Sequence, residues 1–312
     1  MTTVEQSELG VTTALTKRRR RDWRPKRGSN WWRHAVGILA AAFVLLPVIY
    51  IFSAAFNKVP TLADARVIPK DVTLHNFHQI LTTKQIDPTL PTPHFLAWYA
   101  NSIIIPGVAA IFSVFMGALA AYAFSRFRFK GRRMGMMTLL LIQMFPAFLS
   151  VVAIYLILLN VGDVFHFAGL NTRVGLILVY LGGAMGVNTW LMKGFFDTIP
   201  SELDESARVD GATPAQVFWG VILPLATPVL AVIALISYIG ALNEFIIAST
   251  VLQETHKYTL IVGLQQFISG QYAREWGPFA AGVLLTAIAP TALFFALQRF
   301  IVEGLTGGAV KG

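Results

Sequence analysis

The sequence lacks cysteine entirely and contains few charged residues. None of the 312 residues is Cys, and only 13% are Asp, Glu, Lys or Arg, whereas soluble domains carry about 25% charged residues. Without cysteine, disulfides, thiolate zinc sites and cysteine nucleophiles are excluded. The shortage of charge, a hydrophobic fraction of 55% and a mean hydropathy of +0.61 are typical of a membrane protein.

A phosphate-binding loop is also missing. The pattern Gly-x-x-x-x-Gly-Lys-Ser/Thr, whose backbone cradles nucleotide phosphates, occurs nowhere in the chain. Metal ligands are scarce as well, because His75 and His78 lie three residues apart with no third ligand near them in sequence. We therefore expect no catalytic residue, metal or cofactor in this chain. If ATP drives its function, a second polypeptide must bind and hydrolyse the nucleotide.

Six long apolar stretches are present, and a helix of roughly 20 apolar residues crosses a bilayer. They run from about 34 to 56, 95 to 124, 134 to 159, 174 to 192, 226 to 252 and 279 to 302. The sequence therefore predicts an all-α polytopic membrane bundle of six transmembrane helices. Proline, which kinks helices, falls inside several stretches, at Pro47, Pro106, Pro146, Pro228 and Pro290. It is compatible with either a bundle of bent helices or a hinged translocation pathway.

The Lys and Arg residues are divided unequally between the two sides of the membrane that the six stretches define. The side that includes both termini carries 18 Lys and Arg residues, and the other side carries 7. The positive-inside rule therefore places both termini, the basic loop at 125–133 and the acidic segment at 193–225 in the cytoplasm. The net charge of +9 is largely that of the N-terminal arm. Because no recognition fold follows this arm, we expect lipids rather than nucleic acid as its surroundings.

These patterns divide the chain into three parts. A basic cytoplasmic arm is expected over 1–33, a transmembrane domain over 34–302 and a short cytoplasmic tail over 303–312. The segment at 193–225 lies within the transmembrane domain but contains five acidic residues and only two basic ones. It is the most informative polar segment of the chain.

Two short helices are predicted inside this segment. Ser201 is a candidate N-cap, with Asp204 three residues later as an acidic capping-box variant. Thr213 is a candidate N-cap of the second helix, because Pro214 and Gln216 follow at suitable positions.

A glycine and a proline complete the pattern. Gly211 allows a tight turn between the two helices, and Pro224 is expected to end the second. The segment could simply connect two spans. A compact, doubly capped element outside the membrane is better suited to docking a soluble partner.

The same segment resembles the Glu-Ala-Ala motif of permeases in binding-protein-dependent ABC importers. That family pattern is Glu-Ala-Ala, three residues, Gly, nine residues and Ile-x-Leu-Pro. The spacing here matches at every point, with Ser206 in place of the second-position Ala and Val221 in place of Ile. The resemblance implies that a group of residues contacts the ATPase subunit: Glu205, Ser206, Ala207, Asp210, Gly211, Val221, Leu223 and Pro224.

Further runs resemble the smaller permease subunits of maltose/maltodextrin importers, over roughly 95–312. They are Met144-Phe145-Pro146, Gly169-Leu170-Asn171-Thr172, Tyr258-Thr259-Leu260, Gln265-Gln266 and the closing residues 304–312. The resemblance implies the type I ABC importer fold and a multi-pass location in the bacterial inner membrane. The implied partners are a homologous second permease, two ATPase subunits that bind ATP and Mg²⁺, and an extracytoplasmic sugar-binding protein.

It also implies roles for two outer segments. The loop at 253–278 would insert toward the sugar-binding protein, through Tyr258, Gln265, Gln266 and Trp276. The C-terminal tail would reach into the ATPase dimer, through Gly307, Gly308 and Lys311.

The aromatic residues of the outer loop admit two interpretations. Tyr258, Phe267, Tyr272 and Trp276 could stack on sugars, although Tyr272 and Trp276 also suit an interfacial aromatic belt.

Glu244, beside Asn243, is the one acidic residue inside a predicted span. An intramembrane carboxylate indicates either a gating role or a paired structural role. An ion-driven secondary transporter is the alternative function. That class would show inverted repeats and several intramembrane charges, which are not evident here, and a membrane-embedded enzyme would need more catalytic groups than Glu244.

Overall fold

The computed structural model describes residues 31–58, 68–69, 71–82, 94–269 and 275–309, with side chains as far as Ile301. The described residues are largely helical, and the one β-bridge among them joins Asn57 to Val72. Six helical segments are long and apolar enough to cross a membrane, which confirms the predicted all-α fold. They are Trp31–Phe56, Phe95–Arg126, Ala147–Val164, Arg173–Phe196, Pro214–Leu242 and Trp276–Ile301.

The chain divides into two compact units, Met1–Val48 and Ile49–Gly312. In the first unit the described residues form the beginning of α2 (Trp31–Phe56), which starts at Trp31 rather than at the expected His34. Large apolar side chains such as Leu39 and Phe43 are exposed along it, as a lipid-facing helix requires. Of the arm predicted at 1–33, residues 1–30 lie outside the described residues, and residues 31–33 belong to α2.

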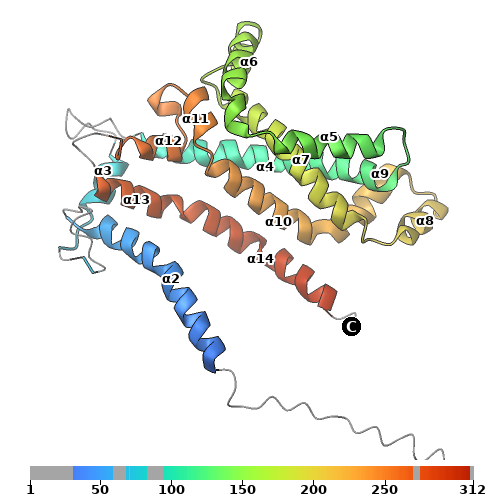
Figure 1. The fold of residues 1–312 in the computed structure, drawn as a ribbon, viewed down its shortest axis with the longest axis horizontal. Helices are drawn as coiled ribbons and strands as arrows, with labels where there is room; N and C mark the ends of the chain where they lie inside the picture. The colour runs from blue at the N-terminus through green and yellow to red at the C-terminus, as the bar shows by residue number, and fades with distance from the viewer. Residues whose placement is uncertain (1–30, 59–67, 70, 83–93, 270–274, 310–312) are drawn as a thin grey trace, which may run out of the picture. The chain divides into compact units, whose positions relative to one another are not determined.

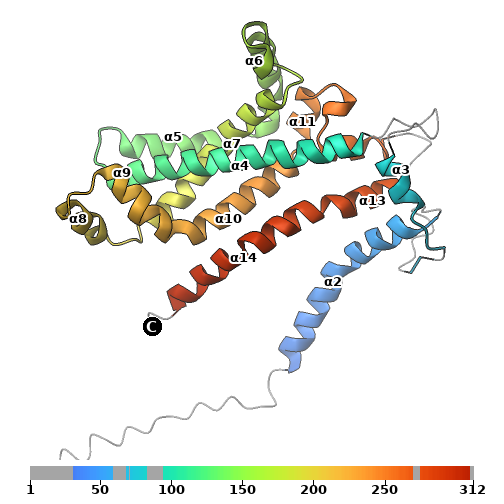
Figure 2. The ribbon, with the colours of Figure 1, turned by 180° about the vertical axis from the view of Figure 1, so that it is seen from behind.

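The second unit is organised around α4 (Phe95–Arg126). It packs along α7 (Arg173–Phe196) and α10 (Leu223–Leu242), as Figures 1 and 2 show. The side-chain amide of Asn188 on α7 donates hydrogen bonds to Ser113 on α4 and Ser237 on α10, at 3.2 and 3.0 Å. Small and polar residues at such contacts are typical of membrane helices, which have no hydrophobic driving force for association.

The third predicted span, a single helix over 134–159, is wrong. The structure has α5 (Arg132–Met144), a 3-10 turn (Ala147–Ser150) and α6 (Val151–Val164), and α6 turns away from α5 (Figure 1). Phe145 and Pro146 are extended, with ψ of 127° and 116°. Proline disfavours the helical conformation of the residue before it, so the break falls there.

The fifth predicted span, 226–252, is also wrong at both ends. A continuous helical run extends from Pro214 to Leu242 and includes α9 (Pro214–Val217), a π-turn (Phe218–Ile222) and α10. The last predicted residues instead form a separate helix, α11 (Ile246–Val251).

The C-terminal helices also differ from expectation. The sixth span consists of α13 (Trp276–Thr286) and α14 (Ile288–Ala309), which meet at Ala287. Because α14 continues to Ala309, residues 303–309 of the expected tail are helical, and Gly307 and Gly308 lie in this helix. Lys311 lies outside the described residues.

Two connections between the spans contain short helices. The first holds α3 (His75–Leu81), where the Asn76 amide donates to the backbone carbonyls of Ala55 and Asn57, each at 2.8 Å. The second holds a 3-10 turn (Thr255–Lys257) and α12 (Leu260–Gln265). These helices lie at one end of the second unit, whereas α8 (Ser201–Val209) and α9 lie at the other (Figures 1 and 2).

Candidate functional site

We call residues 197–224 the coupling segment; it contains α8, a tight turn and α9. The cap of α9 is confirmed, because the Thr213 hydroxyl accepts from the Gln216 backbone N–H at 3.3 Å and the Gln216 side chain accepts from Thr213 N–H at 2.7 Å. The cap predicted for α8 is wrong. Ser201 is already helical and extended Pro200 precedes it, without a side-chain cap.

The turn between the two helices requires glycine. Gly211 has a φ of +87°, in the left-handed region that only glycine adopts without steric cost. Its N–H bonds to the carbonyl of Arg208 at 3.0 Å, and the next N–H, of Ala212, bonds to Ala207 at 2.9 Å. This pair of bonds is the Schellman motif, which satisfies the carbonyls at the end of α8. The tight turn predicted at Gly211 is confirmed.

Pro224 does not end the second helix. The π-turn before it widens the backbone spiral, so Leu223 N–H bonds to the carbonyl of Phe218, five residues back. The register of hydrogen bonds therefore shifts next to the proline, whose missing N–H is tolerated within the continuous helix. The α9 part of the coupling segment is consequently continuous with the span that follows it.

A buried ion pair joins the coupling segment to α4. Arg126 Nε lies 2.9 Å from the Asp204 carboxylate, and the two side chains are only 10% and 5% exposed. The same guanidinium donates to the carbonyl of Ile199 at 2.9 Å. Asp204 was expected to cap α8, and its actual partner comes from a residue 78 positions earlier in the chain. No sequence pattern signals that pairing.

Apolar packing under the segment reinforces the ion pair. Val217, Phe218 and Ile222 are buried against α4 and α7. The rings of Phe218 and Tyr122 lie 5.1 Å apart, and the Tyr122 hydroxyl donates to the carbonyl of Pro214 at 3.3 Å. The end of α4 thus holds both helices of the coupling segment.

The structure divides the predicted ATPase-contact residues into two groups. An exposed group lies around the turn and comprises Glu205, Ser206, Asp210 and Gly211. Ala207, Val221 and Leu223 are half-buried and pack against the apolar cluster below, while Pro224 is exposed. Val209, which was not predicted, is 87% exposed beside the turn. An exposed acid, an exposed apolar residue and a fixed turn on a rigid base form a surface suited to docking.

The opposite end of α4 is built differently. Asn101 is fully buried, and its amide donates to the carbonyls of Lys257 and Tyr258 at 2.8 and 3.0 Å. Trp98 Nε1 donates to the carbonyl of Thr255 at 2.6 Å, and the Ser102 hydroxyl accepts from Leu260 N–H at 2.7 Å. Side chains of α4 therefore hold the backbone of residues 255–260 in place.

Asn171 forms hydrogen bonds with the nearby residues Gln253 and Glu254. It has a φ of +58°, its side-chain oxygen accepts from the N–H groups of Gln253 and Glu254 at 3.1 and 3.2 Å, and its amide donates to the Glu254 carboxylate. The sequence singled out this residue only through a resemblance, and its contacts could not be predicted.

The residues expected to face a binding protein differ in how far their side chains are exposed. Gln265 is exposed, whereas Gln266, Tyr258 and Trp276 are half-buried. Phe267 is 2% exposed and packs against Trp98, so its ring does not form the sugar-stacking surface considered for it. Tyr272 lies outside the described residues.

Glu244 lies in the break between α10 and α11. Its carboxylate accepts from the backbone N–H groups of Ile247 and Ala248, at 2.8 and 2.9 Å, and from the Tyr180 hydroxyl at 3.1 Å. Glu244 therefore caps α11 and links it to α7. These contacts correspond to the paired structural role considered for this carboxylate, rather than to the gating role. Asn243 is exposed and bonds to the carbonyl of Ile239 in its own helix.

No group of three or more His, Asp or Glu side chains capable of holding a metal occurs within the described residues.

Comparison with protein families shows one matching model over residues 113–306, described as the binding-protein-dependent transport system inner membrane component. The chain is 39% identical over 286 residues to the maltose/maltodextrin transport system permease protein MalG of Vibrio parahaemolyticus, covering 90% of this chain and 96% of that protein. It is 38% identical over 283 residues to MalG of Escherichia coli, covering 89% and 95%.

Two solved structures share the fold. A bacterial ABC transporter chain involved in the import of the acidic polysaccharide alginate superposes with a TM-score of 0.69 at 24% identity, covering 96% of this chain and 98% of that one. A chain from a bacterial alginate transporter in complex with an alginate pentasaccharide-bound periplasmic protein gives 0.54 at 19% identity, covering 86% and 93%.

Proposed function

The chain belongs to the family of inner membrane components of binding-protein-dependent transport systems, and we propose that it imports maltodextrins or related oligosaccharides. The observation that carries this proposal is its similarity, over nearly the whole length, to maltose/maltodextrin permeases. As a permease it supplies the transmembrane passage. A homologous second permease, two ATPase subunits and an extracytoplasmic sugar-binding protein complete the proposed transporter.

The coupling segment is the proposed contact with the ATPase. Glu205 and Asp210 offer exposed carboxylates, Gly211 sets the turn, and the buried pair of Arg126 with Asp204 holds the segment on α4. Closure of the ATPase dimer around ATP would push on this surface. Because the segment is continuous with α10 and fastened to α4, the push would move both helices together.

Alternating access follows from this arrangement. ATP binding favours the outward-open bundle, the binding protein releases sugar into it, and hydrolysis restores the inward-open state. Such switching requires each ligand to bind one state more tightly than the other. The proposed orientation places the coupling segment in the cytoplasm, consistent with its five basic neighbours at 125–133.

An ion-driven secondary transporter is not favoured. Glu244, which lies just beyond the span Pro214–Leu242, already accepts three hydrogen bonds from α11 and Tyr180, which leaves it poorly suited to a proton relay.

The proposal is tested by reconstitution into proteoliposomes. The chain with its second permease and ATPase should take up maltodextrin only when ATP and the binding protein are both supplied. ATP hydrolysis by the chain alone, or uptake driven by an ion gradient without ATP, would contradict the proposal.

Gly211→Val tests the coupling segment itself. A β-branched residue at a positive φ should introduce about 1–3 kcal/mol of strain, so ATPase co-purification and uptake should fall while membrane insertion is retained. Gly220→Ala is the matched control, because Gly220 lies in the same segment without a positive φ and has open space around it. Normal uptake by Gly211→Val would show that the segment is only a connector.

A further inference from the structure

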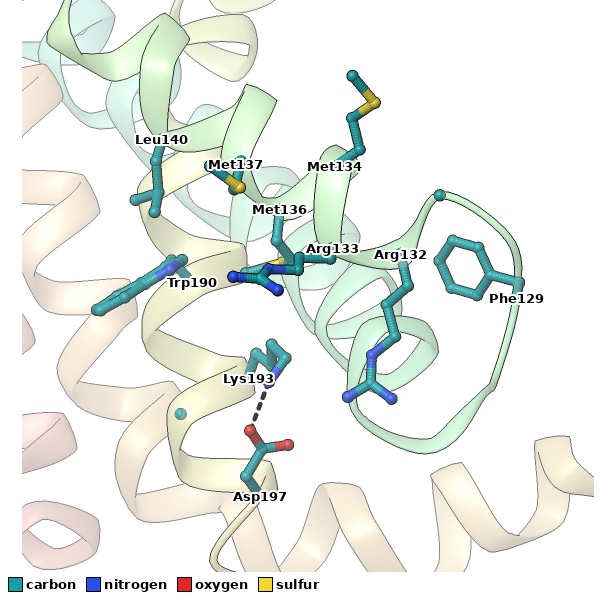
Figure 3. A pocket seen from close by; sticks show the side chains of 12 residues that line it. Phe129, Arg132, Arg133, Met134, Met136, Met137, Leu140, Trp190, Lys193 and Asp197 are labelled. Carbon is teal, nitrogen blue, oxygen red and sulfur yellow. Dashed lines mark hydrogen bonds and ion pairs between the residues drawn. The ribbon is translucent and has the colours of Figure 1, made fainter.

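A cleft of about 1050 Å³ lies between the beginning of α5 and the end of α7 (Figure 3). It adjoins the coupling segment but contains none of the residues assigned to ATPase contact. Its lining is Phe129, Gly131, Arg132, Arg133, Met134, Met136, Met137, Leu140, Trp190, Lys193, Gly194 and Asp197. Basic and apolar side chains therefore share one cavity.

The charges in the cleft do not balance. Lys193 is paired with Asp197, which also accepts a hydrogen bond from Ser125 at 2.7 Å. Partial burial alone would raise the pKa of Asp197, but the hydrogen bonds from Lys193 and Ser125 outweigh it, and Arg132 adds to them, so the pKa falls below its ordinary value. Asp197 therefore stays ionised and neutralises Lys193.

Two positive charges remain. Neither Arg132 nor Arg133 forms an ion pair within the described part of the chain. Both lie in the first turn of α5, whose N-cap, Gly131, has no side chain to satisfy the free N–H groups. The positive end of the helix dipole therefore adds to the two guanidinium charges. The cleft is suited to a phosphate-bearing ligand.

The walls of the cleft are apolar. Met137 and Leu140 extend from α5 on the side where Trp190 of α7 lies, whereas Met134 points away from them (Figure 3). All four side chains are exposed to the cleft or its surroundings. Flexible methionines and a tryptophan accommodate an alkyl chain well. A free phosphate or nucleotide would leave this apolar surface uncovered.

The position of the cleft matches a membrane surface. The spans of α4 and α7 end at Arg126 and Phe196, and the basic residues Arg132, Arg133 and Lys193 of the cleft lie within a few residues of these ends in the chain. Basic pockets between transmembrane helices at the cytoplasmic surface are typical sites for anionic headgroups. Tryptophan is likewise favoured at this depth.

We propose that this cleft is a binding site for one anionic phospholipid, whose headgroup phosphate lies against Arg132 and Arg133 and whose acyl chain lies along Met137, Leu140 and Trp190. Phosphatidylglycerol has the required charge. The inference rests on the cleft and not on the transported sugar. A bound lipid would fill the space between α5 and α7 beside the coupling segment.

Native mass spectrometry of the full chain, purified with the subunits it retains, tests the site. The protein should retain phosphatidylglycerol in preference to phosphatidylcholine. Each basic residue near an anionic lipid contributes roughly a factor of five to binding, so Arg132→Gln with Arg133→Gln should reduce retention by more than about tenfold.

Arg128→Gln with Lys130→Gln is the matched control. It removes the same charge from the same loop, but at exposed residues that do not line the cleft, so retention should stay near that of the unmodified protein. Equal loss in both double variants would show diffuse charge attraction, and no preference for phosphatidylglycerol over phosphatidylcholine would show that the cleft does not select an anionic lipid. Either result would overturn the site.

A spectroscopic measurement locates the lipid without relying on the arginine variants. Phosphatidylglycerol with brominated acyl chains should quench tryptophan fluorescence, and part of that quenching should disappear in Trp190→Phe. With brominated phosphatidylcholine, the quenching should be the same in the unmodified protein and in Trp190→Phe. Identical Trp190-dependent quenching by both lipids would indicate ordinary bilayer contact and would refute a specific site.

Discussion

The two ends of α4 support neighbouring segments in opposite ways. At its C-terminal end, charged and aromatic side chains of α4 contact the underside of the coupling segment and leave Glu205 and Gly211 exposed. At its N-terminal end, Trp98, Asn101 and Ser102 bind the backbone of residues 255–260 directly. A helix of 32 residues is roughly 48 Å long, so one rigid element connects both arrangements.

This difference shows how one helix can serve two purposes. The coupling segment is held by a buried ion pair in addition to hydrogen bonds to its backbone, and its outer side chains stay free for a partner. The hydrogen bonds from α4 to residues 255–260 all go to the backbone. The coupling end is therefore expected to be sensitive in function at exposed residues. Buried residues should affect stability at both ends. Substitutions at Asp204, Asn101 and Asp197 test these expectations, in order of decreasing effect.

The largest effect is expected from Asp204→Asn. Removing one partner of a buried ion pair leaves an uncompensated charge and typically costs about 3–5 kcal/mol, so the variant should unfold at lower temperature in detergent and accumulate less in the membrane. Glu205→Gln changes the adjacent acid, which is exposed, and should alter stability by no more than about 0.5 kcal/mol. We expect Glu205→Gln instead to weaken ATPase co-purification.

A double variant separates the charge from the shape of this pair. Replacing both partners by apolar residues, as Arg126→Met with Asp204→Leu, removes the orphaned charge and should restore most of the stability lost in Asp204→Asn. If Asp204→Asn and Glu205→Gln behave alike, the supposed difference between the buried and exposed faces of α8 is wrong.

An intermediate effect is expected from Asn101→Ala. The buried carbonyls of residues 257 and 258 would lose their donor, and an orphaned buried group costs about 1–3 kcal/mol. Hydrogen exchange should increase in the α12 region and not in α8. Asn160→Ala is the control, because the Asn160 amide bonds only to Leu156 of its own helix at an exposed position. Unchanged exchange near residue 258 in Asn101→Ala would mean that the loop is held by packing alone.

The smallest effect concerns pH and the exposed pair of Lys193 with Asp197. Because the folded state lowers the Asp197 pKa below the ordinary 3.8, the pair stabilises the protein above that pH and loses its contribution as pH falls through the folded value. Solvent screening limits this contribution to about 0.5 kcal/mol. The stability difference between the unmodified protein and Asp197→Asn should therefore shrink in acid, and a difference that grows would show the opposite linkage.

Several features of the fold and site were predictable because they depend on neighbouring residues. Thr213, Pro214 and Gln216 specify the cap of α9, and Gly211 specifies the turn, since each acts within a few positions of itself. The same reasoning failed at Ser201, where extended Pro200 starts the helix one residue earlier than a serine cap would. Asp204, which was expected to take part in that cap, instead pairs with Arg126.

The helix breaks show a similar limit. Pro146 interrupts its span, Pro224 lies within an unbroken run, and Glu244 caps a helix that hydropathy alone merged with its neighbour. A proline's effect depends on whether the surrounding turns can satisfy the freed carbonyl. The hydropathy averaged over a stretch of sequence contains no information on whether that carbonyl finds a hydrogen-bond donor.

The sequence by itself determined the number of spans, the family and the local geometry around Gly211, because length, hydropathy and short-range hydrogen bonds are properties of adjacent residues. Only the tertiary structure decided that Asp204 pairs with Arg126, that Asn101 holds the opposite loop and that Arg132 and Arg133 share a cleft with Trp190. These contacts join residues far apart in the chain, and they form only when α4 packs against α8 and the 255–260 segment and when α5 packs against α7.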